Sequence, residues 1–317
     1  MRKHVIWIVT AVICLLFVFQ FITPAKSGEE EKSKKTTSNL FTISSVNKKV
    51  ALINIFGAIE DPREVLSQLK YFTDNKNVKA IVLSIDSPGG SVGASQEIFR
   101  QIKKSKSSGK VIVAAMGGTA ASGAYYIAAA ADRIVANPGS VTGSIGVIMS
   151  FFNAEKLLDK AGIKFTTIKT GEFKDTGSFS RPSTERERAY LKAVADDVLD
   201  QFVDDVAASR QSQIAAAYGI KSDDETRLKN RVIKTVQEKI ADGRIFTGRQ
   251  AMQIGLVDEM GNLDDAIETA ASMAGISGRP SVMTAIKRQG FASWLDSRIS
   301  SLKIRDDSGF SVKYILQ

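Results

Sequence analysis

Histidine and cysteine are almost absent from this 317-residue sequence: the single histidine is His4 and the single cysteine is Cys14. Everything after residue 14 therefore lacks the side chains of a Ser/His/Asp triad, a Cys/His protease or an imidazole or thiolate metal site. Disulfide frameworks, zinc and haem are excluded for the same reason, and we expect neither a metal nor a cofactor. An enzyme built on the remaining residues must take its nucleophile from Ser, Thr, Lys or a carboxylate, and its proton carrier from Lys, Asp, Glu or Tyr.

An excess of one charge sign is also lacking over most of the chain. The net charge is +9, but residues 49–280 carry 30 basic and 28 acidic side chains, so the basicity lies at the two ends. A balanced central region argues against a nucleic-acid partner. With 44% hydrophobic residues, the chain is long and apolar enough to bury a sizeable core.

Only one long hydrophobic run occurs, at residues 5–22, where eighteen mostly apolar residues without a charge follow Arg2 and Lys3. A helix of this length spans about 27 Å, enough for the hydrocarbon core of a membrane. We expect a short tail (1–4), a transmembrane signal anchor (5–22) and a polar stalk (23–48) rich in Lys, Glu, Ser and Thr. A cleaved signal peptide is the alternative, since small residues follow the run.

Apolar stretches alternate with helical patterns from residue 49 onward. We expect strands over 50–59, 78–85, 110–116 and 134–136, with helices over 91–102 and 184–210. Strands separated by helix-length segments predict an α/β fold with a mostly parallel sheet covered by helices. We place this domain at 49–280 and a basic amphipathic tail at 281–317, where apolar residues from Phe291 to Leu302 follow helical spacing.

Two small-residue segments follow strands and invite a chemical interpretation. Ser122 lies among alanines and glycines at the start of an Ala-rich helix, where an N-cap role is the usual explanation of a serine. Gly89 and Gly90 follow a buried strand and form either a tight connection or a turn that directs amides into a site. Neither segment fits a dinucleotide or phosphate-binding motif, so nucleotide binding is not expected.

Five motifs, in a fixed order, resemble the short form of the signal peptide peptidase A family. They are DSPGG (86–90), GTAASGAYYIA (118–128), PGSVTGSIGV (138–147), KTGEFKD (169–175) and GRIFTGRQA with GLVDEMG (243–261). The resemblance covers residues 49–275 and implies a bacterial membrane-anchored serine protease with a Clp-protease/crotonase-like fold of repeated ββα units. A Ser/Lys dyad does the chemistry in that family, which accounts for the missing histidine.

The resemblance also implies roles for individual residues. The nucleophile falls on Ser122 and the general base on Lys174, while Gly89 or Gly90 together with Gly123 match the oxyanion-hole positions, and Ser144 matches a hydroxyl that positions the lysine. A lysine serves as base only if burial or nearby positive charge lowers its pKa from about 10.4 toward neutrality. Lys169 is the internal rival for this role, and we expect it to lie in solvent.

The resemblance further implies partners and a location. Substrates would be signal peptides remaining after preprotein cleavage and other apolar peptides, reached from a membrane-lipid face. The protease domain would lie on the extracytoplasmic side of the bacterial cytoplasmic membrane. A homo-oligomeric ring or dome is expected. In such an assembly, two neighbouring subunits can together complete one dyad. The alternatives are a crotonase-like acyl-CoA enzyme and a catalytically silent membrane scaffold.

Overall fold

The computed structural model describes residues 49–285 and the backbone of residues 313–315. The predicted anchor, the stalk and the helical stripe of residues 291–302 lie outside the described residues. Within the described part, no helix is long and apolar enough to cross a membrane.

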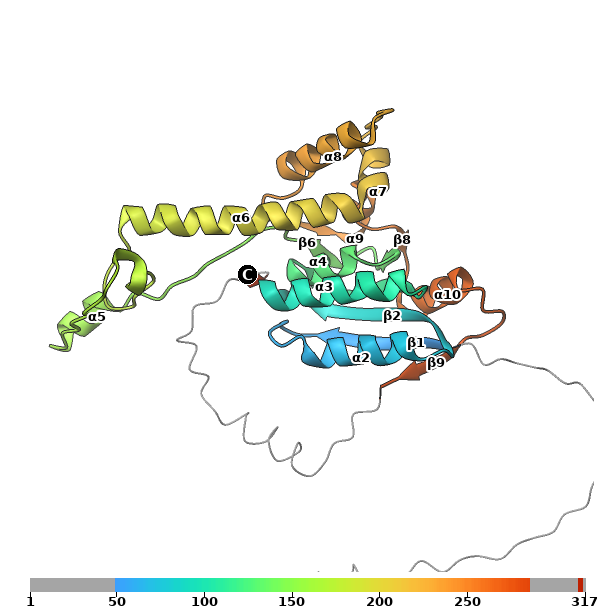
Figure 1. Cartoon of the computed structure of the whole chain (residues 1–317), viewed down its shortest axis with the longest axis horizontal. Helices are drawn as coiled ribbons and strands as arrows, with labels where there is room; N and C mark the ends of the chain where they lie inside the picture. Colours follow the sequence, from blue (N-terminus) through green and yellow to red (C-terminus); the bar gives the residue numbers. More distant parts are fainter. Residues whose placement is uncertain (1–48, 286–312, 316–317) are drawn as a thin grey trace, which may run out of the picture. The chain divides into compact units, whose positions relative to one another are not determined.

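The described residues form ten strands, of which eight make one mixed sheet and two make a separate pair. Figure 1 shows the arrangement of these strands and the helices around them. The strands are β1 (Lys49–Phe56), β2 (Val78–Ser87), β3 (Gly89–Ser91), β4 (Val111–Ala121), β5 (Arg133–Ala136), β6 (Val141–Gly143), β7 (Ile245–Thr247), β8 (Glu259–Met260), β9 (Ser281–Thr284) and β10 (Lys313–Ile315). The order is β7-β6-β4-β2-β1-β9, and β5 joins β4 to β8. All pairs of this sheet are parallel except β6 with β7, which confirms the predicted α/β fold with a mostly parallel sheet.

The helices lie between these strands in the chain. They are α2 (Arg63–Asp74), α3 (Val92–Ser107), α4 (Gly123–Ala129), α5 (Glu155–Lys160), a 3₁₀ turn η1 (Glu172–Asp175), α6 (Glu185–Ser209), α7 (Gln211–Ala217), α8 (Glu225–Lys239), α9 (Gly248–Gln253) and α10 (Leu263–Met273). Residues 281–284, which the sequence assigned to the tail, form the edge strand β9 beside β1. The sheet therefore extends beyond residue 280.

The alternation of side chains along the strands fills both faces of the sheet. On β2, Ile81, Leu83 and Ile85 enter a large core shared with α2, α3 and α4, while Ala80 and Val82 enter a smaller core beneath α10. Successive strand residues point to opposite faces, so a strand buried on both sides contains a continuous apolar run. This is why β2 could be predicted from its sequence.

The long strand β4 changes partner part-way along its length. Residues 113–116 pair with β5, and residues 119–121 pair with β6. The sequence predicted only residues 110–116, because the small residues that follow have weak strand propensity. The extension matters for the site, since it brings the end of β4 beside the ends of β2 and β6.

A long excursion leaves the sheet between β6 and α6. We call residues 149–183 the arm; it carries α5 and η1, and Figure 1 shows α5 beyond the N-terminal end of α6. Every residue from 161 to 174 is exposed. The arm therefore contributes little to the sheet core.

Candidate active site

Ser122 occupies a sharp turn between β4 and α4. Its backbone adopts φ 55° and ψ −121°, a combination that costs a residue with a side chain on the order of 1–3 kcal/mol. Two hydrogen bonds hold the turn: the Ser122 N–H donates to the Gly143 carbonyl at 2.7 Å, and the Tyr126 N–H donates to the Ser122 carbonyl at 2.9 Å. A strained serine at a strand-to-helix turn is the geometry of a nucleophile elbow.

The Ser122 hydroxyl is buried and unpaired. The residue is 1% exposed, and its Oγ has no hydrogen-bond partner within the part of the chain described. A buried hydroxyl without a partner typically costs 1–3 kcal/mol. An N-cap serine would instead accept a hydrogen bond from the helix, and Ser122 does not. The structure therefore removes the N-cap explanation of this serine.

Backbone conformation and close packing explain why both Gly89 and Gly90 are glycines. Gly89 has φ 102°, and a Cβ on Gly90 would lie 2.1 Å from the Ile59 carbonyl oxygen. The Gly89 N–H donates to Ser87 Oγ, and the Gly89 carbonyl accepts from the Ile59 N–H. Since Gly89 and Ser91 both bond Ile59, the backbone groups of Gly90 point to the opposite edge of β3. Of the two predicted oxyanion glycines, the geometry thus favours Gly90.

That opposite edge of β3 is paired with the chain's own last strand. β10 runs antiparallel to β3, with Tyr314 opposite Gly90 and Ile315 opposite Gly89. This edge of β3 therefore accepts an extended segment in antiparallel register.

Ser144 lies immediately beyond the residue that holds Ser122. It has φ 50°, is 7% exposed, and its N–H donates to the Arg244 carbonyl. Because Gly143 accepts the Ser122 N–H, the two serines are neighbours at the edge where β2, β4 and β6 end. A cavity of about 480 Å³ begins at Ser144 and is walled by residues 146–148, α6 and residues 241–243.

Lys174 does not meet Ser122 within the chain. It lies on η1, where its N–H donates to the Gly171 carbonyl at 3.2 Å, and its exposed side chain forms no hydrogen bond or ion pair with another described residue. The structure thus brings Gly89, Gly90, Ser122, Gly123 and Ser144 together and leaves Lys174 on the arm. Lys169 is exposed, as expected, and its Nζ also donates to Asp175 at 2.6 Å and to the Glu172 carbonyl at 2.8 Å.

An ion-pair network fixes the turn that carries Lys174. Arg181 donates to both carboxylate oxygens of Asp175 and to Glu187, whose side chain is 2% exposed. Hydrogen bonds from Arg181 and Lys169 lower the pKa of Asp175 well below its usual value. Hydrogen bonds from Arg181 and from the Thr184 amide lower the pKa of Glu187 to about 2. Sequence reasoning missed Arg181 and Glu187, although the Thr184–Glu187 capping-box spacing is visible in the sequence.

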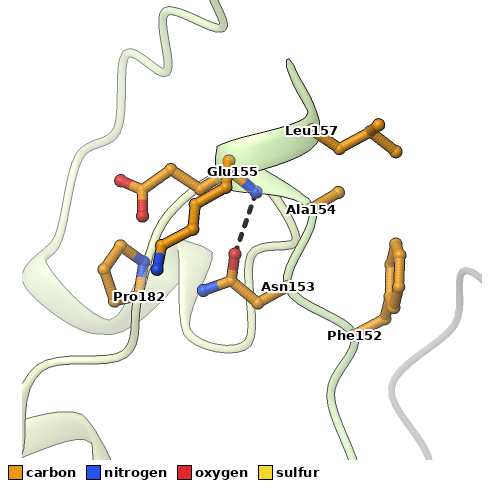
Figure 2. Close-up of a pocket in the computed structure, with 7 residues that line it drawn as sticks. Phe152, Asn153, Ala154, Glu155, Leu157 and Pro182 are labelled. Carbon is orange, nitrogen blue, oxygen red and sulfur yellow. Dashed lines mark hydrogen bonds between the residues drawn. The ribbon is translucent and has the colours of Figure 1, made fainter. Parts of the chain in front are cut away.

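The arm presents an unusual amount of apolar surface. It contains eight of the sixteen large hydrophobic residues that are exposed in the described part. They are Phe151, Phe152, Leu157, Ile163, Phe165, Ile168, Phe173 and Phe179. Figure 2 shows the pocket at the start of α5, with Phe152, Ala154, Leu157 and Pro182 among its lining residues. Its volume is about 480 Å³. Exposed apolar surface on this scale marks an interaction site.

Comparison with known proteins decides the family. The sequence profile of peptidase family S49 matches residues 104–221 and 228–277, which include Ser122, Ser144 and Lys174. The chain belongs to peptidase family S49. The profile of Clp protease also matches, over residues 34–140, in agreement with a Clp-like fold. Membership makes the protein a serine-type protease and confirms the resemblance to the signal peptide peptidase A family.

Individual relatives agree with this assignment. A Synechocystis protein named "Putative protease" is 42% identical over 235 residues, covering 74% of this chain and 77% of its own length. An Enterococcus faecium protein named "Putative signal peptide peptidase SppA" is 32% identical and covers 93% of this chain and 88% of its own length. The "Serine protease SPPA, chloroplastic" of Arabidopsis thaliana is 33% identical over 67% of this chain and 28% of its own length.

Proposed function

We propose that this S49 peptidase is a membrane-anchored endopeptidase in which Ser122 of one copy works with Lys174 of a neighbouring copy. Two facts together carry the proposal: the Ser122 hydroxyl is buried without a partner among the described residues, and Lys174 lies apart from it on an exposed arm. A nucleophile needs a base within about 3 Å, and the sequence after His4 contains no histidine for that role. An arm rich in exposed apolar residues supports its insertion against a second copy.

The chemistry follows from the groups at the site. Neutral Lys174 Nζ takes the proton of Ser122 Oγ as the oxygen attacks the peptide carbonyl carbon. The carbonyl oxygen gains the negative charge and accepts hydrogen bonds from the Gly90 and Gly123 amides. The lysine ammonium then gives its proton to the leaving amine as the peptide C–N bond breaks, which leaves an acyl ester on Ser122. Water next attacks the ester carbonyl carbon and gives a proton to the lysine. The bond to Ser122 Oγ then breaks, and the lysine returns that proton to the serine oxygen. The Ser144 hydroxyl, beside Ser122, would hold the incoming lysine in place.

The β3 edge supports an extended peptide as substrate. β10 pairs with Gly89–Ser91 in antiparallel register, and this pairing depends on backbone groups that any peptide shares. We infer that substrates are apolar peptides, remnant signal peptides among them, held in this register. Residues 5–22 would anchor the chain in the bacterial cytoplasmic membrane, with the protease domain on the extracytoplasmic side.

Subunit mixing tests the proposal. Ser122→Ala and Lys174→Met are each expected to be inactive, whereas an assembly co-expressed from equal amounts of both should regain up to about a quarter of the parent activity. In a random assembly, about half of the sites have an intact serine, and about half of the neighbours supply an intact lysine. About a quarter of the sites therefore contain both. Mixed assemblies that remain inactive would contradict a dyad shared between copies.

A serine-directed phosphonate probe separates catalysis from a scaffold role. We expect the full-length protein to be labelled and the Ser122→Ala variant to escape labelling. Equal labelling of both proteins would remove Ser122 as the nucleophile.

A further inference from the structure

Seven charged side chains lie on or against the turn that carries Lys174, and six of them are paired. The six are Lys169, Glu172, Asp175, Arg181, Arg186 and Glu187. Glu172 pairs with Arg186 at 2.9 Å, Asp175 pairs with Lys169 and Arg181, and Glu187 pairs with Arg181. Lys174 forms no ion pair with any described residue, although Asp175 directly follows it in the chain.

This arrangement matters because a base must give up its proton before it can act. A carboxylate within about 4–6 Å of a lysine favours the charged ammonium and opposes that loss. The Asp175 carboxylate is instead bonded on both oxygens by Arg181 and on one by Lys169 at 2.6 Å. The pKa of Asp175 is accordingly held well below its usual value, which fits a carboxylate that remains charged and fully paired.

We propose that Lys169 and Asp175, with Arg181, are positioning residues that keep the carboxylates of the arm away from Lys174, so that this lysine can serve as the general base. The inference rests on the proposed function, since it assigns roles around the base of the same dyad. These roles also explain why KTGEFKD contains two lysines five residues apart. Lys169 forms an ion pair with Asp175, and the Lys174 side chain has no ion-pair partner among the described residues.

The receiving site adds few charges of its own. Among the described residues near Ser122 and Ser144, the charged side chains include Asp86, which accepts the Thr119 N–H, and Asp242, which pairs with Arg244. Lys192 and Asp196 of α6 also line the cavity at Ser144 and pair with each other at 2.6 Å. Each of these carboxylates thus has a partner already. The cluster of Lys169, Asp175, Arg181 and Glu187 contains two cations and two anions. A substitution within it therefore changes the net charge near Lys174 by one unit.

The test is the pH profile of kcat/KM for the full-length protein, with an apolar peptidyl-aminomethylcoumarin as substrate. Lys169→Met leaves the cluster with one excess negative charge, and we expect the midpoint of the alkaline rise to move up by about 0.5–1 pH unit. Asp175→Asn leaves one excess positive charge, and the midpoint should move down. The double variant restores neutrality, and its midpoint should return to that of the parent.

The matched control is Lys234→Met, which breaks an exposed lysine–carboxylate pair with Glu238 on α8 and should leave the midpoint unchanged. A purely structural clamp would lower kcat at every pH without opposite shifts for the two single variants. Shifts of the same sign, or no shift, in variants that keep their melting temperature would overturn this inference while Ser122→Ala and Lys174→Met remain inactive. A Lys169→Met protein inactive at every pH beside an active Lys174→Met protein would instead overturn the proposed dyad.

Discussion

The segment around Ser122 and the segment around Lys174 differ in almost every physical respect. Residues 120–131 are all buried, whereas residues 161–174 are all exposed. Ser122 is held by backbone hydrogen bonds to β6 and α4, and its strain is offset by the packing of the sheet core. The Lys174 turn is held by side-chain ion pairs within the arm. The fold of one chain thus buries and orients Ser122 but leaves Lys174 on an exposed turn, and in our proposal a neighbouring copy brings the two together.

The strongest test of this difference removes each of the two reacting groups. Ser122→Ala and Lys174→Met should each lower kcat/KM by about 10⁴-fold or more, and the double variant should be no worse than either one. Their stabilities should differ in a revealing way: Ser122→Ala melts at or above the parent temperature because an unpaired buried hydroxyl is lost. Lys174→Met should melt like the parent. A double variant far less active than both singles would show that the two residues do not act together.

Gly90→Ala tests the buried half of the site alone. A Cβ at this position lies 2.1 Å from the Ile59 carbonyl oxygen, so β3 must shift and its amide must leave the oxyanion position. We expect kcat to fall by about 10²–10³-fold, as for removal of one oxyanion donor. Gly93→Ala on α3 is the matched control, since a Cβ there meets nothing within 4 Å. Retained kcat in Gly90→Ala would exclude this amide from the oxyanion hole.

Arg210→Met and Arg181→Met compare a core ion pair with an arm ion pair. Arg210 is 1% exposed, pairs with Asp258 at 2.7 Å and also donates to the Gly255 carbonyl. Its loss should lower the free energy of unfolding by about 3–5 kcal/mol, measured by urea denaturation. Arg181→Met should instead raise hydrogen exchange within the arm and leave exchange in β2 and β4 unchanged. Equal exchange increases in both regions would mean that the arm folds with the core.

Deletion of residues 313–317 examines the edge of the buried site. β10 covers the β3 edge that we assign to substrate, so its removal should lower KM a few-fold and leave kcat unchanged. Steady-state kinetics of the deleted and parent proteins measure the effect. An unchanged KM would show that the substrate does not use this edge.

Acidification tests the arm with the smallest expected effect. The pKa of Glu187 is lowered to about 2 when folded, so its carboxylate stabilises the protein above the ordinary glutamate pKa, near 4.5, and this contribution is lost as the pH falls through 2. The melting-temperature advantage of the parent over Glu187→Gln should therefore be constant above pH 5 and shrink between pH 5 and 2. An advantage that persists at pH 2 would argue against the Arg181 pairing.

Local patterns predicted most of the sheet because they depend on neighbours in the sequence. The apolar runs of β1 and β2 and the periodicity of α6 were found within a few residues of their observed bounds. At the start of α2, Pro62 precedes the helix, and Asp61 accepts the Arg63 N–H. Strands β7 and β8 were not predicted, since two or three residues of strand carry no periodicity, and the four residues of β9 were assigned to the tail.

The sequence by itself determined the chemistry open to this protein, because the absence of histidine and cysteine after residue 14 and five ordered motifs indicated a serine protease with a lysine base. Only the tertiary structure decided how those residues are arranged. The choice of Gly90 over Gly89 depends on Ile59, thirty residues earlier, and the pairing of Lys169 depends on Asp175 and Arg181. The separation of Lys174 from Ser122 depends on where an exposed arm leaves the sheet. These arrangements depend on contacts between residues that are not neighbours in the sequence, which local propensity and periodicity do not encode.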